Sequence, residues 1–193
     1  MLLTHAKIEF EDHCIPPAKY KQLKESKAFP YNGNLPVWEE DGTQYCQSIA
    51  IMRMLGIRHG YYTTDPAEAW LIDSVIDFIA NGCIQNLYPL IMGQKFGDPA
   101  SEASFISQWK QMGKVLDARL EEHGKQFIAG TDTISIADFV VASHYFGLIY
   151  NDYGAVGGKL KQKILDVIAE TPSLQRYLET TMTEELIDFL AIR

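Results

Sequence analysis

Residues 31–56, YNGNLPVWEEDGTQYCQSIAIMRMLG, hold the side chains whose types and order suggest a binding site. Leu35–Pro36 precedes a short apolar run, and Gln47–Ser48 opens an amphipathic segment. A helix start presents free backbone N–H groups and the positive end of the helix dipole, so a hydroxyl and an amide placed there can help to hold a carboxylate. Together these residues predict a site for a small anionic molecule. Taken one at a time, Pro36 also fits an edge strand, and Ser48 also fits a simple helix cap.

A hairpin and a helix are the elements expected to position this site. Asp41–Gly42 lies between two extended runs, which predicts a β-hairpin. A helix is expected from about Ser48, with Gly56 near its end. Upstream, apolar and polar residues alternate over residues 7–12, which predicts a short strand, and residues 18–26 favour a short exposed helix.

A run of turn-forming residues divides the chain into two parts. We expect an incomplete α/β domain over residues 1–60, a linker over 61–68 and an all-helical domain over 69–193. In the helical part, apolar residues recur at intervals of four, three, four and four, which predicts one buried helix face. These residues are Phe105, Trp109, Met112, Leu116 and Leu120.

Ser135 and Asp138 predict the start of a further helix. They stand three residues apart and form a capping-box variant with Asp in place of Glu or Gln. Ile134 and Phe139 occupy the positions of a hydrophobic staple across the same cap. Because these signals specify a helix start, we assign Ser135 and Asp138 a structural role as the cap.

Composition argues against several classes of function. The 193 residues are 47% hydrophobic and carry a net charge of −8, which disfavours a nucleic-acid partner. No apolar run is long enough to cross a bilayer, and the N-terminus has no secretory leader, so no membrane partner is expected. Cys14, Cys46 and Cys83 are isolated and the five histidines are dispersed. We therefore expect free thiols, no metal site and a cytoplasmic location.

The ordered motifs resemble those of one family. Leu-Pro at 35–36, Asp-Gly at 41–42 and Gln-Ser at 47–48 look like the glutathione transferase pattern, in which a cis-proline precedes a hairpin and a Gln/Glu-Ser pair starts the next helix. SIAD after Gly130 resembles the family's N-capping box, and PSLQRYL from Pro172 resembles its late helix. The similarity covers nearly the whole chain in the right order and is nearest to the sigma- and mu-like cytosolic classes.

The resemblance implies a thioredoxin-like glutathione-binding part followed by an all-α helical bundle, with glutathione as co-substrate. The Leu35–Pro36 bond would be cis, which turns the Leu35 backbone outward to pair with the cysteinyl part of glutathione like an added strand. Ser48 would offer its hydroxyl and backbone N–H to the γ-glutamyl carboxylate, and Gln47 would contribute an amide to the same end.

Further positions match the family by spacing. Tyr20 and Lys24 fall where sigma-like members reach the glycyl carboxylate, although one exposed face of a polar helix is their other interpretation. Phe29–Pro30 resembles the mu-like pair whose aromatic ring inserts into a neighbouring subunit. Asn81 falls where members commonly place an Asp that reaches the γ-glutamyl ammonium across the dimer interface, and Asn supplies no negative charge.

The family's first strand and most of its first helix have no counterpart in this sequence. That strand carries or precedes the family's catalytic Tyr, Ser or Cys, so the catalytic residue of this chain is unknown. Its loss would expose strand edges on both sides. Three explanations stay open: a longer gene product, another chain that supplies cover, or a degenerate domain that relies on its helical half.

Two functions from different classes follow from the resemblance. The first is a homodimer that conjugates glutathione to small electrophiles, or performs a related isomerase or peroxidase reaction. Tyr88 and Tyr145 are candidates for the electrophile-binding wall, with a plain core role as the alternative. The second function is a non-catalytic dimerisation or scaffold subunit of a larger assembly. A thioredoxin-like oxidoreductase is disfavoured because the chain has no C-x-x-C.

Overall fold

The computed structural model describes residues 1–81, 98–150 and 157–181 of the chain. In these ranges the chain forms mostly helices and one hairpin. The elements are α1 Leu2–His5, α2 Pro17–Glu25, the 3-10 turn η1 Pro30–Asn32, β1 Val37–Glu40, β2 Thr43–Cys46, α3 Ser48–His59, α4 Pro66–Ile79, α6 Pro99–His123, α7 Ile136–Tyr150, α8 Gly157–Ala169 and α9 Pro172–Thr181.

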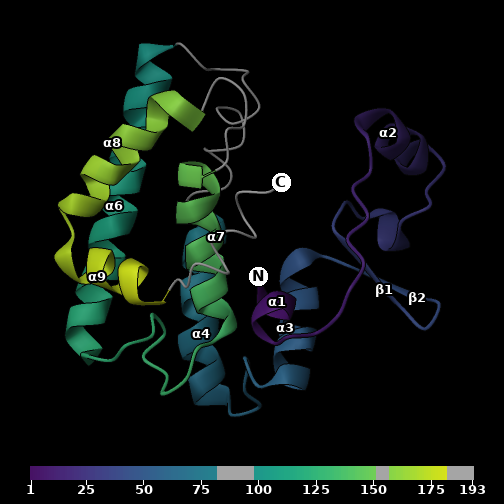
Figure 1. Cartoon of the computed structure of the whole chain (residues 1–193), viewed down its shortest axis with the longest axis horizontal. Coiled ribbons are helices and arrows are strands. Elements are labelled where there is room, and N and C mark those ends of the chain that lie inside the picture. The colour runs from purple at the N-terminus through teal and green to yellow at the C-terminus, as the bar shows by residue number, and fades with distance from the viewer. Residues whose placement is uncertain (82–97, 151–156, 182–193) are drawn as a thin grey trace.

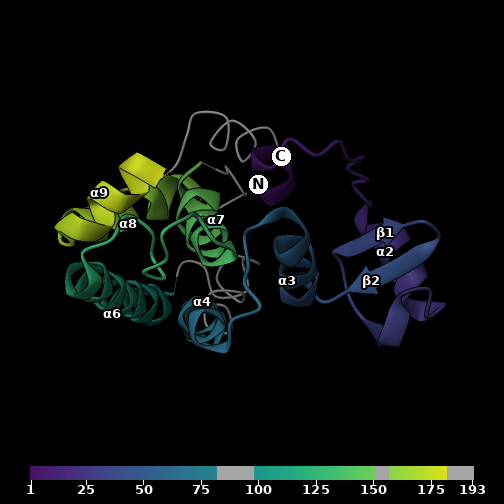
Figure 2. The same cartoon turned by 90° about the horizontal axis from the view of Figure 1, so that it is seen from below.

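The elements form two parts joined through α3. Helices α6, α8 and α9 lie at one end of the molecule, and α2 with the β1–β2 hairpin lies at the other (Figures 1 and 2). Helices α4 and α7 stand between them and pack against each other. Because α3 contacts both β2 and α7, it connects the hairpin to the helical part.

The helical part is built on the apolar stripe that the sequence predicts. All five residues of the stripe are buried on α6, with Trp109 fully enclosed. The Trp109 ring packs edge-on against Tyr145, with 4.7 Å between ring centroids, and lies 5.8 Å from the ring of Phe105. Burying a large aromatic side chain among others of its kind is a major source of stability.

Asp138 organises the start of α7 from inside the core. Its carboxylate accepts the backbone N–H of Ser135 at 2.8 Å, which is one half of a capping box. The other half differs, since the Ser135 hydroxyl donates to the same carboxylate at 2.9 Å instead of accepting the N–H of residue 138. Ile128 N–H and Tyr177 O–H also donate to it, at 3.0 and 2.8 Å. Burial raises the pKa of Asp138, and these donated hydrogen bonds oppose that rise.

The hairpin forms as predicted around Asp41–Gly42. Both residues have positive φ, 50° and 74°, as the two-residue turn that matches the twist of paired strands requires. The strands are antiparallel, with Glu40 opposite Thr43 and Val37 opposite Cys46. This register places the residues after β2 beside the residues before β1.

Helix α3 is longer than the sequence suggests. We expected Gly56 near its end, but the helix continues to His59, and Gly60 takes the left-handed conformation of a C-terminal cap at φ 81°. Gly56 serves a different purpose. A Cβ there would lie 2.8 Å from Ile136 Cγ2 and 2.9 Å from Tyr62 Cβ, so its missing side chain lets α3 approach α7 closely.

The prediction of a strand over residues 7–12 is wrong. These residues form neither helix nor strand, and the sheet in the described part of the chain consists of β1 and β2 alone. Lys7 has a φ of 57°, which turns the chain away directly after α1. Alternating residues make a strand only where a second strand lies alongside to take their hydrogen bonds, and none does so here.

Candidate functional site

The register of the hairpin brings together the two motifs that the sequence singled out. Val37 pairs with Cys46, so Leu35–Pro36 before β1 and Gln47–Ser48 after β2 emerge at the same end of the hairpin. The Leu35–Pro36 peptide bond is cis, as the family resemblance implied. The Leu35 side chain is 40% exposed. The backbone turn at Leu35–Pro36 and the start of α3 therefore lie together at one surface of the molecule.

Ser48 and Gln47 do not cap α3. Ser48 is exposed, and neither side chain makes a hydrogen bond to any described residue. Gln47 has φ 74° and ψ 100°, a conformation that costs a non-glycine residue on the order of 1–3 kcal/mol and that proteins concentrate at functional sites. A strained residue beside a free hydroxyl at the start of a 12-residue helix is the arrangement expected of a site for an anion.

Helix α2 supports the backbone just before the cis bond. The ammonium group of Lys24 donates to the carbonyl oxygen of Gly33 at 2.7 Å, and the hydroxyl of Tyr20 donates to Asn34 Oδ1 at 3.0 Å. The sequence placed Tyr20 and Lys24 at a ligand carboxylate. The structure places them against residues 33–34, directly before Leu35.

The ring of Phe29 also supports the loop at residues 33–34. Phe29 is buried at 8% exposure and stacks on Tyr20, with 6.0 Å between ring centroids. The predicted insertion of this ring into a neighbouring subunit is therefore wrong, because its own chain already encloses it. Gly33 lies so close to β2 that an added Cβ would stand 3.0 Å from Cys46 Sγ.

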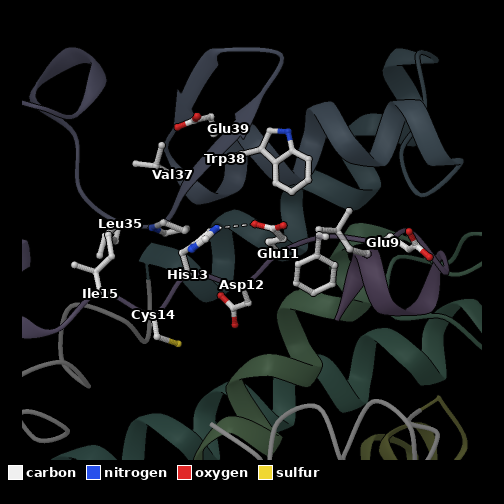
Figure 3. A pocket seen from close by; sticks show the side chains of 13 residues that line it. Glu9, Glu11, Asp12, His13, Cys14, Ile15, Leu35, Val37, Trp38 and Glu39 are labelled. Carbon is white, nitrogen blue, oxygen red and sulfur yellow. Dashed lines mark hydrogen bonds and ion pairs between the residues drawn. The ribbon is translucent and has the colours of Figure 1, made fainter.

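A large open cavity, about 1230 Å³, begins at Leu35 and Pro36. Residues 9–15 form one wall, and the β1 residues Val37, Trp38 and Glu39 form the other (Figure 3). In the same view the His13 ring faces the Glu11 carboxylate, and the two are 3.0 Å apart. The cavity thus extends from the predicted glutathione site along the free side of the hairpin.

Sequence reasoning missed His13 and Cys14 as residues of this cavity. Both line it, and Cys14 is an exposed free thiol. No motif marks either residue in the sequence. The sequence pattern predicts a strand just before them, over residues 7–12. Only the tertiary placement of this segment opposite β1 brings the two side chains near the end of the cavity that begins at Leu35.

A polar network fastens the site helix α3 to α4. Arg53 donates to Asp73 at 3.0 Å, and the hydroxyl of Tyr62 donates to the same carboxylate at 2.8 Å. Burial raises the pKa of Tyr62, and the neighbouring Asp73 carboxylate raises it further. Arg58, in the last turn of α3, also donates to Glu40 of the hairpin. These contacts fix the direction in which the start of α3 points.

Other predicted residues lie apart from this site. Asn81 is exposed just after α4, in the helical part. The assignment of Tyr145 to a substrate-binding wall is wrong, because its side chain has no exposed surface and packs on Trp109. Tyr88 and Cys83 lie outside the described residues.

Among the described residues, no three His, Cys, Asp or Glu side chains gather where they could hold a metal ion. In the same ranges, every helix is too short or too polar to cross a membrane.

Comparison with known proteins finds similarity to one class of enzymes. The chain is 28% identical over 184 residues to glutathione S-transferase 3 of Caenorhabditis elegans, covering 92% of this chain and 86% of that protein. It is 39% identical over 79 residues to glutathione S-transferase 2 of Manduca sexta, and there it covers 41% of this chain and 37% of the relative's length. Over most of its length the chain is therefore similar to cytosolic glutathione transferases.

Solved structures of transferases share its fold. Monomeric Na-GST-3, a glutathione S-transferase from the hookworm Necator americanus, superposes with a TM-score of 0.78 at 21% identity, covering 100% of this chain and 88% of that one. This agrees with a thioredoxin-like N-terminal part and a helical C-terminal part. No family model matches the chain.

Proposed function

We propose that this chain binds glutathione and conjugates it to small electrophiles, or performs a related glutathione-dependent isomerase or peroxidase reaction. One observation carries the proposal: at the start of α3, beside the cis Leu35–Pro36 bond, the side chains of Ser48 and the strained Gln47 make no hydrogen bond to any described residue. The similarity to named glutathione S-transferases supports the same reaction class.

Each residue of the site has a defined task in this proposal. The backbone of Leu35 pairs with the cysteinyl part of glutathione, and Pro36 sets its direction. Ser48 and the first N–H groups of α3 hold the γ-glutamyl carboxylate, while Gln47 adds an amide. Lys24 and Tyr20 hold the loop at residues 33–34, and the Lys24 charge lies close enough to that loop to attract the glycyl carboxylate.

Calorimetric titration of glutathione into the 193-residue chain tests this proposal. We expect saturable binding that Ser48→Ala weakens by roughly tenfold, because a hydrogen bond to a charged group contributes about 1.5 kcal/mol. Ser107→Ala is the matched control, since it removes another exposed serine hydroxyl, on α6, far from the site. A folded protein that releases no heat with glutathione, or equal affinity in both variants, would contradict the assignment.

A non-catalytic scaffold or dimerisation subunit is the second candidate function. It is favoured by the two-stranded sheet and by Asn81, which supplies no charge toward a partner's glutathione site. Conjugation of glutathione to an electrophilic dinitrobenzene separates the two candidates. Turnover that Ser48→Ala reduces favours the enzyme, and glutathione binding without turnover favours the scaffold.

We also propose that the chain forms a homodimer. Tyr31, at 96% exposure and φ 52°, projects from the loop before the cis bond, and Trp70 on α4 is 67% exposed. Tyr and Trp are enriched at protein–protein interfaces relative to the rest of the surface. Light scattering should give twice the chain mass, and Tyr31→Ser should shift it toward the monomer. A monomer at every concentration would refute the dimer.

The finer assignments belong to the same proposal. We assign residues 1–60 to the glutathione-binding domain, 61–68 to the linker and 69–193 to the helical domain. The sigma- and mu-like classes and a cytoplasmic location stay predictions of the sequence motifs.

A further inference from the structure

A groove of about 510 Å³ lies between α6 and α8, at the end of the molecule opposite the hairpin (Figures 1 and 2). The first half of α6 forms most of its lining, and Lys163 contributes from α8. Its volume falls within the range of roughly 300–1,000 Å³ that is usual for small-molecule sites. None of the residues assigned to glutathione lines it, so the groove is a separate surface.

The floor of the groove is an apolar strip along α6. Pro99, Ala103 and Ile106 follow one another at intervals of four and three, so they lie on one face of the helix. This strip differs from the buried stripe that begins at Phe105, because Pro99 and Ala103 are exposed. Ile106 is half-buried and packs against the hydrophobic core, which supports the floor from beneath. Covering this strip with an apolar ligand would remove it from water, which is favourable.

Two ion pairs cross from α6 to α8, one near each end of the groove. Lys163 of α8 pairs with Glu102 at 3.3 Å, and Lys110 pairs with Glu170 of α8 at 2.6 Å. Glu102 and Lys110 stand eight residues apart in α6, which corresponds to about 12 Å along the helix axis. The two pairs therefore tie α6 to α8 on both sides of the centre of the strip and leave that centre open.

The pair formed by Lys163 is the looser of the two. Its 3.3 Å separation exceeds the roughly 2.7–2.9 Å of strong hydrogen bonds between charged groups, whereas the Lys110 pair is short. An ammonium group also has three donors, of which one contact with a carboxylate uses one. Lys163 can therefore donate to an anion in the groove while it stays close to Glu102.

The more exposed partner of this loose pair is the cation. The side chain of Lys163 is 50% exposed and that of Glu102 is 23% exposed, so a ligand in the groove reaches the ammonium group more readily than the carboxylate. Lys110, which also lines the groove, is held more closely by Glu170. Among the described residues of the lining, Glu102 is the only carboxylate. The charges therefore favour a ligand anion that binds at Lys163.

We propose that this groove binds a small amphipathic anion, an aliphatic chain that ends in a carboxylate. The carboxylate accepts hydrogen bonds from Lys163, and the chain lies over Pro99, Ala103 and Ile106. This goes beyond the proposed transferase function, because the ligand is neither glutathione nor an electrophile and its site lies on helices outside the glutathione site.

Calorimetric titration of decanoate into the 193-residue chain, below the concentration at which decanoate forms micelles, tests the proposal. We expect saturable binding of decanoate and none of decyltrimethylammonium, which carries the opposite charge on the same chain. Lys163→Met should weaken decanoate binding roughly three- to tenfold, as expected for a charged hydrogen bond at a half-exposed position. Lys125→Met is the matched control, because Lys125 also forms a surface ion pair, with Asp132, but lies outside the groove. It should leave the affinity unchanged.

A second variant should change the affinity in the opposite direction. Glu102→Gln removes the carboxylate that competes with the ligand for Lys163, so decanoate should bind more tightly, by up to about fivefold. Glu179→Gln removes one negative charge at an exposed position outside the groove and should leave the affinity unchanged. Equal tightening in both variants would mean that decanoate responds to net charge alone, and the site would be refuted.

NMR shifts of the backbone amides locate the bound chain. We expect shift changes in α6 near Ala103 and Ile106 and in α8 near Lys163. Changes centred on the start of α3, no saturable binding of decanoate, equal binding of decyltrimethylammonium, or equal affinity in Lys163→Met and Lys125→Met would each overturn the proposal.

Failure of this proposal is distinguishable from failure of the proposed function. Ser48→Ala should weaken glutathione binding and leave the affinity for decanoate unaltered, and Lys163→Met should do the reverse. Decanoate should also bind equally well in the presence of saturating glutathione. Competition between the two ligands would show that they share one site, and the inference would be wrong.

Discussion

The two ends of this molecule differ in how much apolar surface each of them buries. Within residues 1–60 the buried hydrophobic side chains are few: Leu2, Phe29, Ile51 and Leu55. The helical end encloses continuous stripes from α4, α6, α7 and α9. A two-stranded hairpin is marginal by itself in water. The hairpin end, residues 1–60, therefore depends on α3, which packs it against the helical end, and on loop contacts such as Lys24 with Gly33.

The largest effect should come from the core of the helical end. Trp109→Ala removes a fully enclosed ring that packs on Phe105 and Tyr145, and it should lower the free energy of unfolding by about 3–5 kcal/mol. Trp70→Ala, at a 67% exposed position, should change it by less than about 0.5 kcal/mol. Urea denaturation measures the free energy of unfolding of both variants. Similar losses in the two variants would contradict the expected difference between core and surface positions.

The next effect should come from Asp138. Asp138→Ala leaves the donors of Ile128, Ser135 and Tyr177 without their buried acceptor, and we expect a loss of about 2–4 kcal/mol of unfolding free energy. Asp132→Ala is the matched control, because that carboxylate pairs with Lys125 at the exposed surface and should have a much smaller effect than Asp138→Ala. A control that cost as much as Asp138→Ala would show that the buried carboxylate has no special role.

Gly56→Ala tests the close packing of α3 against α7, which connects the two ends. The added methyl group would meet Ile136 and Tyr62 at under 3 Å, so α3 must shift, at a cost of about 1–3 kcal/mol. Gly147→Ala, in α7, meets nothing within 4 Å and should instead stabilise by about 0.5–1 kcal/mol through helix propensity. Thermal unfolding compares them. Stabilisation by both changes would mean that α3 does not rely on close contact with α7.

The smallest effect should be confined to the hairpin end. Lys24→Met removes the bond to Gly33 O and should speed hydrogen exchange of the Gly33 amide, which is itself bonded to Pro30 O at 2.8 Å. We expect a rate increase of roughly five- to tenfold, corresponding to about 1 kcal/mol of local opening, with global stability unchanged. Lys21→Met, one turn away and exposed, is the control. An equal loss of global stability would show that the two ends unfold as one unit.

Local signals in the sequence predicted much of the fold. The spacing of the apolar residues in α6 is enough to place them on one face of a helix. Asp41–Gly42 is likewise enough to favour the turn of the hairpin. The hairpin register also follows from the turn, and it brings the Leu-Pro and Gln-Ser motifs to one end of the hairpin, while their role in binding stays a prediction. The predictions of the stripe and of the hairpin are confirmed because their physics acts within a few residues.

Predictions that needed a distant partner did not succeed. Residues 7–12 have the alternation of a strand, but alternation supplies no neighbour to pair with. Glycine often ends a helix, but Gly56 lies inside α3. Its lack of a side chain there makes room for Ile136, eighty residues later in the chain. The alternative interpretation of Ser48 as a simple helix cap does not hold among the described residues, where its side chain makes no capping hydrogen bond.

The sequence by itself determined the helical stripe, the hairpin and the order of the site motifs, since each depends on spacing over one or two turns of chain. Only the tertiary structure decided that Tyr177 donates to Asp138, that Lys24 and Tyr20 hold the loop before Leu35, and that residues 9–15 line a cavity opposite β1. The reason is physical: burial and hydrogen-bond partnership are properties of neighbours in space, and local spacing does not specify which distant residues those neighbours are.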